Sequence, residues 1–392
     1  MKIGLVLSST PAYSETFFNS KIKGLLENGF EVLLFVQHKQ ANFSLCKVVE
    51  SPKIYKNAIF QFFAIIYEFI LLVPYFKAVS KFLILEHSQK TSIINCIKKT
   101  YLNADLLKQQ LDWLHFGFAT MAIGKEYVAN SIGAKMAVSF RGFDIAIYPL
   151  KNPNCYELLF KQVTRAHTIS NDLLQRAYEL GLDNKTPVAK ITPAIDTNIF
   201  KPFFNKNFAN ETKQFLTVTR LHWKKGIVLM LEALAIVKSK GHKFKYTIVG
   251  TGTDYEFERI KFAILQFNLT NEVNLVGIRN REEVLEYYNK ATIYLQYSIS
   301  EGFCNAVLEA QAMGLLCVVS DAEGLPENIE DNVSGWVVLK LNAPALASKI
   351  IEVYSLGEIE KMNTSNNARK RVIDNFSLND QNEKFKQFYC ND

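Results

Sequence analysis

The alternation of short apolar runs with helical stretches is the feature that most constrains the fold of this chain. Each apolar run is followed by turn residues and then by a segment with helical periodicity. Parallel strands need long crossover connections, usually helices, so this alternation predicts an α/β fold with parallel sheets. Predicted strands include residues 2–9, 31–36, 137–140, 215–219, 273–277 and 293–298.

A polar stretch that ends near residue 213 interrupts this alternation in the middle of the chain. At 392 residues the chain is long enough for two or three domains, and 48% hydrophobic residues can fill their cores. We therefore predict an N-terminal domain over residues 1–203 and a C-terminal domain over residues 204–374. Residues 375–392 are predicted to form a C-terminal helix.

Charge and cysteine usage bound the partners and the compartment. The net charge is +7 and the pI is near 8.9, a modest excess that fits anionic partners such as nucleotide diphosphates or an anionic membrane face. Lys and Arg are scattered and no nucleic-acid-binding spacing is present, so we expect no nucleic acid. The six cysteines lack a C-x-x-C pair, and the apolar run at residues 3–7 is too short for a signal peptide. We expect a cytoplasmic protein.

Residues 58–76 form an apolar segment that is long enough to raise the question of a membrane span. Glu68 near its centre and Pro74 near its end argue against a simple span. A buried helix or an amphipathic helix on a bilayer surface fits better, and we expect peripheral contact with the inner face of the cytoplasmic membrane. Basic residues that suit anionic headgroups follow the segment: Lys77, Lys81, Lys98 and Lys99.

Residues 300–314 (SEGFCNAVLEAQAMG) carry the most specific chemical pattern. They predict a loop that becomes a helix at Asn305, which can cap it, and ends at Gly314. Glu301 then lies in the loop and Glu309 in the helix. Free N–H groups at such a helix start attract phosphate, and a carboxylate nearby can accept hydrogen bonds from hydroxyls. The pattern favours a sugar nucleotide as ligand.

Two cations follow the strand predicted at residues 215–219. Arg220 and Lys225 stand five positions apart at a strand-to-helix turn, where they can bind both phosphates of a nucleotide diphosphate. No convincing Asp-x-Asp pair is present, and the nearest sequence, Asp321-Ala322-Glu323, is typical of a turn after a strand. We therefore predict no metal site, with the two cations stabilising the leaving diphosphate instead.

A glycine turn at residues 250–253 invites comparison with dinucleotide-binding loops. Tyr255 stands where the third glycine of G-x-G-x-x-G is required, so NAD or FAD binding is not supported. We expect no cofactor other than the nucleotide sugar that serves as donor substrate.

Glu301-x7-Glu309, with Glu-Gly-Phe at its start and Glu-Ala-x-Ala-x-Gly at its end, resembles the signature of the retaining GT4 glycosyltransferases of the GT-B fold. The loop of Arg220 and Lys225 followed by glycine is similar to another motif of this family. Further similar stretches are residues 191–202 ahead of the linker, and residues 11–18 with 25–32, which resemble members that build bacterial surface polysaccharides.

The resemblance implies two Rossmann-like domains that face a cleft, the first binding the acceptor and the second the donor. It also implies that the C-terminal helix crosses back to pack on the N-terminal domain. The activity it implies is retaining transfer of a hexosyl unit from UDP- or GDP-sugar to a sugar hydroxyl of a glycan, with a lipid-linked acceptor suggested by residues 58–76. Both a covalent intermediate and a same-face attack stay open.

By resemblance, the expected catalytic residues are Glu301, Lys225, Arg220 and Arg141. Glu309 would bind the ribose hydroxyls and Glu301 the donor sugar. Backbone amides near Phe303 would bind the diphosphate. The expected donor-binding residues are Arg220, Lys225, Gly277, Ile278, Arg279, Glu301, Gly302, Phe303, Cys304, Asn305 and Glu309.

The expected acceptor-side residues are Ser14, His115, Arg141 and Asp144. Ser14 can also cap the first helix, in a loop that lacks the Gly-Gly pair of many relatives. Arg141 stands where much of the family has histidine. Arginine cannot act as a base near neutral pH, so Arg141 would act electrostatically, and Asp144 would pair with it or with substrate hydroxyls. The alternatives are a strand-end salt bridge for these two and a structural role for His115.

Other functions of this fold class remain open. A sugar-nucleotide 2-epimerase would act on donor alone, and a phosphorylase would need phosphate. A non-catalytic sugar-binding partner of a membrane synthase would release no nucleotide diphosphate.

Overall fold

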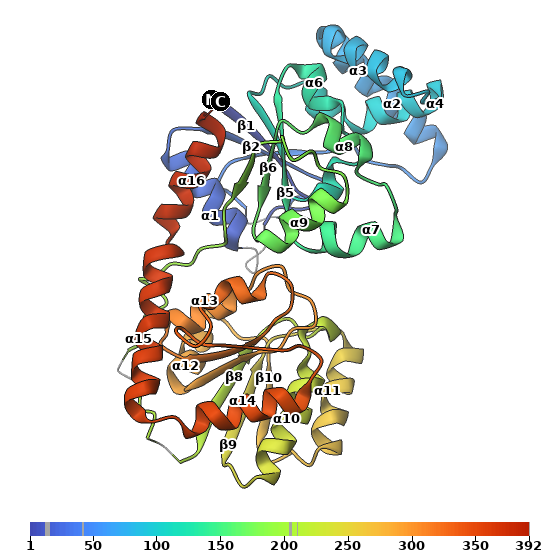
Figure 1. Ribbon diagram of the computed structural model, residues 1–392. Helices are drawn as coiled ribbons and strands as arrows, with labels where there is room; N and C mark the ends of the chain where they lie inside the picture. Colours follow the sequence, from blue (N-terminus) through green and yellow to red (C-terminus); the bar gives the residue numbers. More distant parts are fainter. Residues whose placement is uncertain (12–15, 41–42, 204–205, 210, 392) are drawn as a thin grey trace. The chain divides into compact units, whose positions relative to one another are not determined.

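The computed structural model describes residues 1–11, 16–40, 43–203, 206–209 and 211–391 (Figure 1). The chain folds as two compact units, one of Met1–Ile191 with Asn382–Asp392 and the other of Thr192–Gln381. The predicted boundary at residue 203 thus differs from the observed division between Ile191 and Thr192. Residues just after this division belong to unit 2, since Ile195 donates its N–H to Phe376 O at 3.1 Å.

Unit 1 contains a seven-stranded, fully parallel sheet with the order β3-β2-β1-β4-β5-β6-β7. Its helices include a π-helical turn, η3, and short 3-10 turns η1 and η2. The strands are β1 (Lys2–Val6), β2 (Glu31–Val36), β3 (Lys47–Glu50), β4 (Trp113–Phe116), β5 (Lys135–Phe140), β6 (Arg165–Thr168) and β7 (Val188–Lys190). The helices are α1 (Thr16–Glu27), α2 (Ala58–Leu72), η1 (Val73–Tyr75), α3 (Phe76–Ser88), α4 (Ile93–Leu102), α5 (Ala104–Leu107), η2 (Ala119–Ala122), α6 (Val128–Ile132), η3 (Phe143–Ile147), α7 (Tyr148–Lys151), α8 (Glu157–Gln162) and α9 (Asn171–Glu179).

Unit 2 contains a six-stranded parallel sheet with the order β10-β9-β8-β11-β12-β13. Helices α10, α11 and α14 build a large apolar core on one face, and α12, α13 and α15 lie on the other (Figure 1). The strands are β8 (Lys213–Val218), β9 (Phe244–Val249), β10 (Val273–Gly277), β11 (Ile293–Gln296), β12 (Leu316–Ser320) and β13 (Trp336–Val338). The helices are η4 (Trp223–Lys225), α10 (Ile227–Ser239), α11 (Asp254–Gln266), α12 (Arg281–Lys290), α13 (Asn305–Ala312), η5 (Leu325–Asn328), α14 (Ala343–Ser355) and α15 (Glu358–Asn375). Helix α16 (Leu378–Cys390) begins in unit 2 and continues into unit 1.

Both sheets follow the doubly wound strand order of the Rossmann fold, so the predicted α/β class with two Rossmann-like units is confirmed. The return of the C-terminal helix is also confirmed. Phe385, Phe388 and Tyr389 of α16 join the core that α1 forms on the sheet of unit 1. Trp113 donates its indole N–H to Tyr389 O at 3.2 Å, which fixes the end of α16 against β4.

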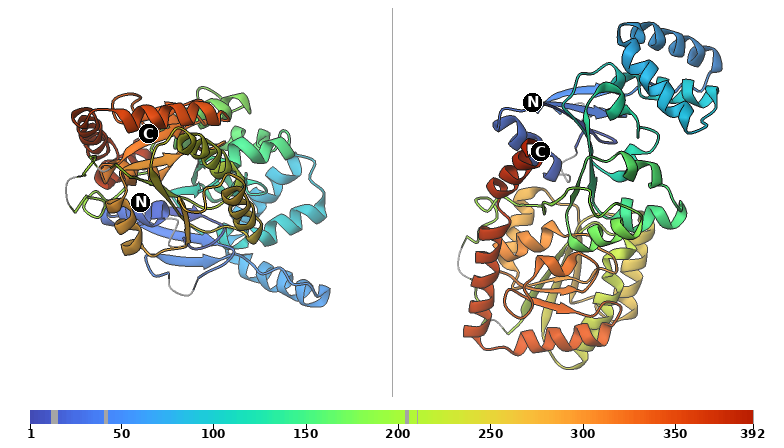
Figure 2. Two further views of the ribbon diagram at one scale, coloured as in Figure 1. Left: turned by 90° about the horizontal axis from the view of Figure 1, so that it is seen from below. Right: turned by 45° about the horizontal axis from the view of Figure 1, so that its top comes forward.

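Helices α2, α3 and α4 interrupt the alternation between β3 and β4 and project from the body of unit 1 (Figure 2). The predicted helix in residues 58–76 is confirmed, whereas the prediction that it could be buried is wrong. Of α2, only Leu72 is buried. Among the described residues, Ala58–Ser88 is the one helical stretch long and apolar enough to cross a membrane, and only 6% of its most apolar window is buried.

Candidate functional site

The centre of the sheet of unit 2 contains a topological switch point. Strands β8 and β11 are neighbours, and the chain winds outward from them in opposite directions, toward β10 and toward β13. The loops after two such strands diverge and leave a crevice at the carboxyl end of the sheet, where doubly wound folds bind ligands. Arg220 and Lys225 follow β8, and Glu301 follows β11. The residues singled out by their chemistry therefore flank this crevice.

Backbone contacts hold the two loops against each other. Ile299 and Ser300 donate their N–H groups to Lys224 O at 2.7 and 3.4 Å. Gly226 has φ +64, and a Cβ there would lie 2.0 Å from the carbonyl oxygen of Tyr297. Only glycine allows this approach, so the turn after Lys225 and the end of β11 fix each other.

The Lys225 ammonium and the Glu301 carboxylate form an ion pair through Nζ and Oε2, and each side chain is 14% exposed. The Ser298 hydroxyl donates to the same Oε2 at 3.4 Å. Burial acts to lower the pKa of Lys225, but the adjacent Glu301 carboxylate outweighs it and raises the pKa above its usual value. Lys225 therefore stays protonated at neutral pH, within a largely desolvated ion pair.

Glu323 positions the Glu301 loop, a contact that sequence reasoning missed. Glu301 donates its N–H to Glu323 Oε2 at 2.6 Å, and Lys340 pairs with Glu323 Oε1 at 3.4 Å. Glu323 has φ +41, an unfavourable backbone conformation for a glutamate. The predicted turn at Asp321-Ala322-Glu323 is present, and Asp321 accepts the N–H of Lys340 at 2.7 Å. The acidic side chains of this turn thus hold backbone N–H groups of neighbouring loops.

The start of α13 differs in detail from the prediction. The N-cap is Cys304 rather than Asn305, and no side chain caps the helix. Asn328 replaces a local cap, because its side chain accepts the N–H of Cys304 at 3.1 Å and donates to Cys304 O at 2.9 Å. Asn305 becomes the first helical residue, and the first-turn N–H groups lie at the positive end of α13.

Phe303 and Cys304 are buried, so any contact with a ligand comes from their backbone. The Phe303 ring packs on Phe376 with centroids 5.9 Å apart. Burial raises the pKa of the Cys304 thiol to about 12, which keeps it protonated and poorly nucleophilic at neutral pH.

Glu309 lies on α13 and accepts a hydrogen bond from the Tyr288 hydroxyl at 2.9 Å. Burial raises the pKa of Glu309, and the Tyr288 hydrogen bond opposes this rise. Tyr288 comes from α12 and was not predicted from the sequence. Its hydroxyl orients the carboxylate and leaves acceptor capacity for a second donor.

The remaining donor-side residues lie on the same edge of the sheet. Arg220 is exposed, and no ion pair of its guanidinium is found within the described part of the chain. Gly277 ends β10, Ile278 is 71% exposed, and Arg279 donates to Ile278 O at 2.8 Å. Strand β9 separates β10 from β8, so these three residues flank the crevice at a distance from Lys225.

Of the predicted acceptor-side residues, Ser14 lies outside the described residues. Arg141 follows β5 in unit 1, and its guanidinium carbon lies 3.6 Å from the Phe17 ring centroid and 4.4 Å from that of Phe18. Aromatic faces stabilise a guanidinium and align its plane. Sequence reasoning named Arg141 but missed these aromatic partners.

Asp144 is fully buried and organises the loop after β5. Its Oδ1 accepts the N–H groups of Arg141 and Gly142 at 3.0 and 2.9 Å, and its Oδ2 accepts that of Ala119 at 3.0 Å. Burial raises the pKa of Asp144, and these three hydrogen bonds oppose the rise. Backbone N–H groups contact both oxygens of this carboxylate. The pairing of Asp144 with Arg141 or with substrate hydroxyls stays a prediction.

His115 lies inside β4 and is fully buried. Its ring nitrogens contact the Tyr389 hydroxyl at 2.5 Å and the Ser139 hydroxyl at 2.8 Å. Burial lowers the pKa of His115 well below the usual range, so the ring stays neutral. This geometry matches the structural alternative for His115 and not a role at an acceptor.

Two Rossmann units in one chain, with a cation and carboxylates at the switch point of the second, define the class of GT-B proteins. Residues 199–371 match the model of the family "Glycosyl transferases group 1". The chain belongs to this family, and the predicted family membership is confirmed.

Two bacterial relatives match the chain over about two thirds of its length. The amylovoran biosynthesis glycosyltransferase AmsK of Erwinia amylovora is 32% identical over 67% of this chain. The putative colanic acid biosynthesis glycosyltransferase WcaL of Escherichia coli K12 is 29% identical over 67% of this chain. The match spans 66% of the length of each relative, slightly less than two thirds.

The fold agrees with solved structures over nearly the whole chain. The Anabaena protein Alr3699/HepE, solved in complex with UDP-glucose, superposes with a TM-score of 0.72 over 99% of this chain and 98% of that one. The sequence identity is 15%, so this likeness establishes the fold alone.

Proposed function

We propose that the chain is a retaining glycosyltransferase of bacterial surface polysaccharide biosynthesis, which transfers a hexosyl unit from UDP- or GDP-sugar to a sugar hydroxyl. The observation that carries this proposal is the Lys225–Glu301 ion pair beside the start of α13, at the switch point of unit 2. The roles of AmsK in amylovoran biosynthesis and of WcaL in putative colanic acid biosynthesis, and the UDP-glucose bound by the Anabaena protein, support it.

The positive charges of the site would bind the donor diphosphate. Lys225 is desolvated and permanently protonated, and Arg220 is exposed on the same loop. As the glycosidic bond breaks, negative charge grows on the leaving diphosphate, and fixed cations with helix N–H groups stabilise it. We propose that these groups serve without a metal ion. Among the described residues, no group of three or more His, Cys, Asp or Glu could hold one.

The two glutamates would divide the sugars of the donor between them. Glu309, oriented by Tyr288, would accept hydrogen bonds from the ribose hydroxyls. Glu301, held by Lys225 and by its N–H to Glu323, would accept them from the transferred sugar. A carboxylate in an ion pair is a weak nucleophile and the Cys304 thiol stays protonated, so we favour same-face attack assisted by the leaving phosphate.

The acceptor would be a lipid-linked glycan at the cytoplasmic face of the membrane. Unit 1 carries the projecting apolar helices α2 to α4, which suit an enzyme that meets its acceptor at a lipid surface. Arg141, stacked on Phe17 and Phe18, would bind a phosphate or another acidic group of this acceptor.

The test is release of nucleoside diphosphate by purified protein. UDP- and GDP-sugars are supplied one at a time, with a detergent extract of the lipid-linked glycans of the source bacterium. We expect one donor to release its diphosphate only with the extract, and NMR of the product to show the donor's anomeric configuration. Turnover of donor alone would instead identify an epimerase, and release that depends on inorganic phosphate a phosphorylase.

A further inference from the structure

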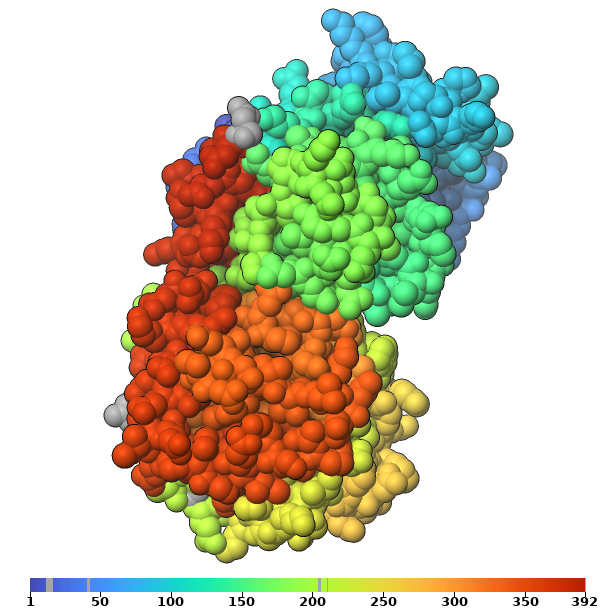
Figure 3. Space-filling model, in the orientation of Figure 1, coloured from blue at the N-terminus to red at the C-terminus, as the bar shows by residue number. Residues whose placement is uncertain are grey.

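The segment between β3 and β4 exposes an unusual amount of apolar surface. We call residues 58–102, which comprise α2, α3 and α4, the apolar lobe; it is the light-blue protrusion of Figure 3. Large side chains on α2, on the turn η1 after it and at the start of α3 are 60% to 66% exposed: Phe60, Phe62, Phe63, Ile70, Val73 and Phe76. A helix that is apolar around most of its circumference is stable in water only when another phase or molecule covers it.

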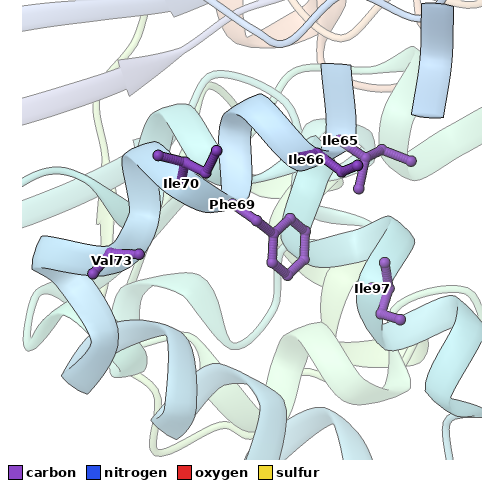
Figure 4. A pocket seen from close by; sticks show the side chains of 6 residues that line it. All are labelled: Ile65, Ile66, Phe69, Ile70, Val73 and Ile97. Atoms are coloured by element: carbon purple, nitrogen blue, oxygen red, sulfur yellow. The ribbon is translucent and has the colours of Figure 1, made fainter. Parts of the chain in front are cut away.

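A shallow groove of about 460 Å³ lies between α2 and α4 (Figure 4). Its lining is entirely apolar: Ile65, Ile66, Phe69, Ile70, Val73 and Ile97. The groove makes the apolar face continuous from one helix to the next, so a single apolar phase can cover both.

Both acidic side chains of the lobe are in ion pairs, so the charges that remain on its surface are positive. Glu68 pairs with Lys108 at 2.7 Å, and the buried Glu86 pairs with Lys99 at 2.7 Å. No other Asp or Glu occurs in residues 51–102. The remaining lysines of this stretch are exposed: Lys53, Lys56, Lys77, Lys81, Lys90 and Lys98. The surface thus consists of apolar side chains bordered by cations.

We propose that the apolar lobe docks this protein on an anionic lipid bilayer, with α2 and α4 in the interface and the lysines among the headgroups. Apolar area together with basic residues is the combination that holds interfacial helices on anionic membranes. A second copy of the chain fits less well. A twofold contact would place this patch against itself, and lysine would face lysine with no free carboxylate to pair.

The contacts of the lobe with unit 1 favour docking over crossing. The helix bends at η1, which contains Pro74, and α3 packs on α6. Phe82 and Glu86 are buried in this packing. A bilayer span would have to break these contacts and the Glu68–Lys108 pair, whereas a helix that lies in the interface keeps them.

Vesicle flotation of the full chain tests the proposal. We expect the protein to float with phosphatidylcholine vesicles that contain phosphatidylglycerol, less so with phosphatidylcholine alone, and less at high salt. The variant Phe62→Gln/Phe63→Gln/Ile70→Gln should bind at least about tenfold more weakly. The variant Lys77→Gln/Lys90→Gln/Lys98→Gln should lose the preference for anionic lipid.

The matched control is Tyr255→Gln/Phe262→Gln/Leu265→Gln, because these α11 residues are also exposed, at 71%, 66% and 66%. It should float like the wild type. The proposal is overturned if the wild type stays free of vesicles, or if the α2 variant floats unchanged. A wild-type dimer that the α2 variant dissociates, without vesicle binding, would assign the lobe to a second copy.

Single substitutions to tryptophan provide a second test that does not depend on whether the triple variants fold. The fluorescence of a Phe63→Trp protein should be quenched by lipids with brominated acyl chains, while that of Phe262→Trp should not. Equal quenching of the two would contradict the proposal. The docking proposal rests on the proposed function in one respect: that function gives the protein a reason to approach a membrane. The vesicles contain no donor or acceptor, so failure to bind them is distinct from failure to transfer sugar in detergent.

Discussion

At the scale of single residues, the Lys225 ammonium and the Glu301 carboxylate define the chemistry of unit 2. The pair is mostly removed from water, yet Glu301 keeps the pKa of Lys225 above its usual value. In a desolvated crevice, such a charge interacts more strongly with a diphosphate than it would on the surface. The turn that carries it is fixed by Gly226 against Tyr297.

Replacing Lys225 tests this role. Lys225→Met should lower kcat by about 100-fold or more, because the variant loses charge stabilisation of the leaving diphosphate. Lys225→Arg keeps the charge and should retain more activity than Lys225→Met. Steady-state kinetics with the accepted donor measure both. A Lys225→Met protein with wild-type kcat would remove Lys225 from the proposed mechanism.

Asp105 gives a prediction about pH. It is 5% exposed, and burial raises the pKa of its carboxyl to about 6, against the opposing effect of the Ser51 hydroxyl. The folded state therefore holds this proton more tightly than the unfolded chain, in which Asp titrates near pH 3.9. Between about pH 4 and pH 6 the unfolded chain releases this proton while the folded state still holds it, and this lowers the free energy of the unfolded state relative to the folded state. This contribution to stability is present at low pH and is lost as the pH rises through that window.

Asp105→Asn removes the titration. Relative to the wild type, the free energy of unfolding of the variant should increase by about 3 kcal/mol in total from about pH 3 to about pH 7, most steeply between pH 4 and pH 6, and then stay level. Urea unfolding at several pH values measures this difference. A difference that does not vary with pH would show that Asp105 titrates normally.

Site residues that directly follow a strand could be predicted from the sequence. Site residues that reach the site from elements distant in the sequence could not. Lys225 and Glu301 each stand in a strand-to-helix loop, so their sequence positions indicated the edge of the sheet. Tyr288 and Glu323 reach the site through tertiary contacts that no local pattern encodes. The cap at Cys304 was missed for the same reason, since its partner Asn328 lies in η5.

At the scale of elements, packing explains where the sequence pattern failed. Strand β4 has only four residues, and the polar His115 interrupts its apolar character, so it was not among the predicted strands. Hydroxyls of Ser139 and Tyr389 satisfy this histidine inside the core. Neither partner is near His115 in the sequence, because Ser139 lies in β5 and Tyr389 in the C-terminal helix α16. By contrast, the long periodic helices and the apolar central strands were predictable.

Lys206 anchors the end of α12, the helix that carries Tyr288. Its Nζ donates to the carbonyl oxygens of Tyr288, Asn289 and Ala291 at 2.5, 2.9 and 2.9 Å, and the residue is 8% exposed. These are carbonyls at a helix C-terminus, which have no intrahelical donor. A buried amino group, whose pKa burial lowers to about 7, therefore replaces a cap.

Lys206→Met should destabilise the protein by about 3 kcal/mol, because it leaves these carbonyls buried without a donor. The control on the same helix is Lys290→Met, whose side chain is 70% exposed and should cost less than about 0.5 kcal/mol. Chemical denaturation compares the two. Equal small losses would contradict the capping role of Lys206.

At the scale of the whole molecule, one strand order serves two tasks. Both units have the doubly wound order, but in the described residues only unit 2 places a Lys–Glu ion pair at its switch point. Unit 1 instead carries the apolar lobe and returns α16 to its own core. The alternation of elements predicted two α/β units, whereas the strand order and the projection of the lobe depend on tertiary contacts.

The most direct test of the central claim, a diphosphate site on unit 2, is calorimetric titration with UDP, GDP and their monophosphates. We predict that one diphosphate binds at least about tenfold more tightly than its monophosphate, because fixed cations bind the second phosphate. In Arg220→Met/Lys225→Met this difference should fall below about twofold, while Arg141→Met, in unit 1, should retain it. Equal affinity of the wild type for mono- and diphosphates, or an unchanged difference in the double variant, would contradict the account.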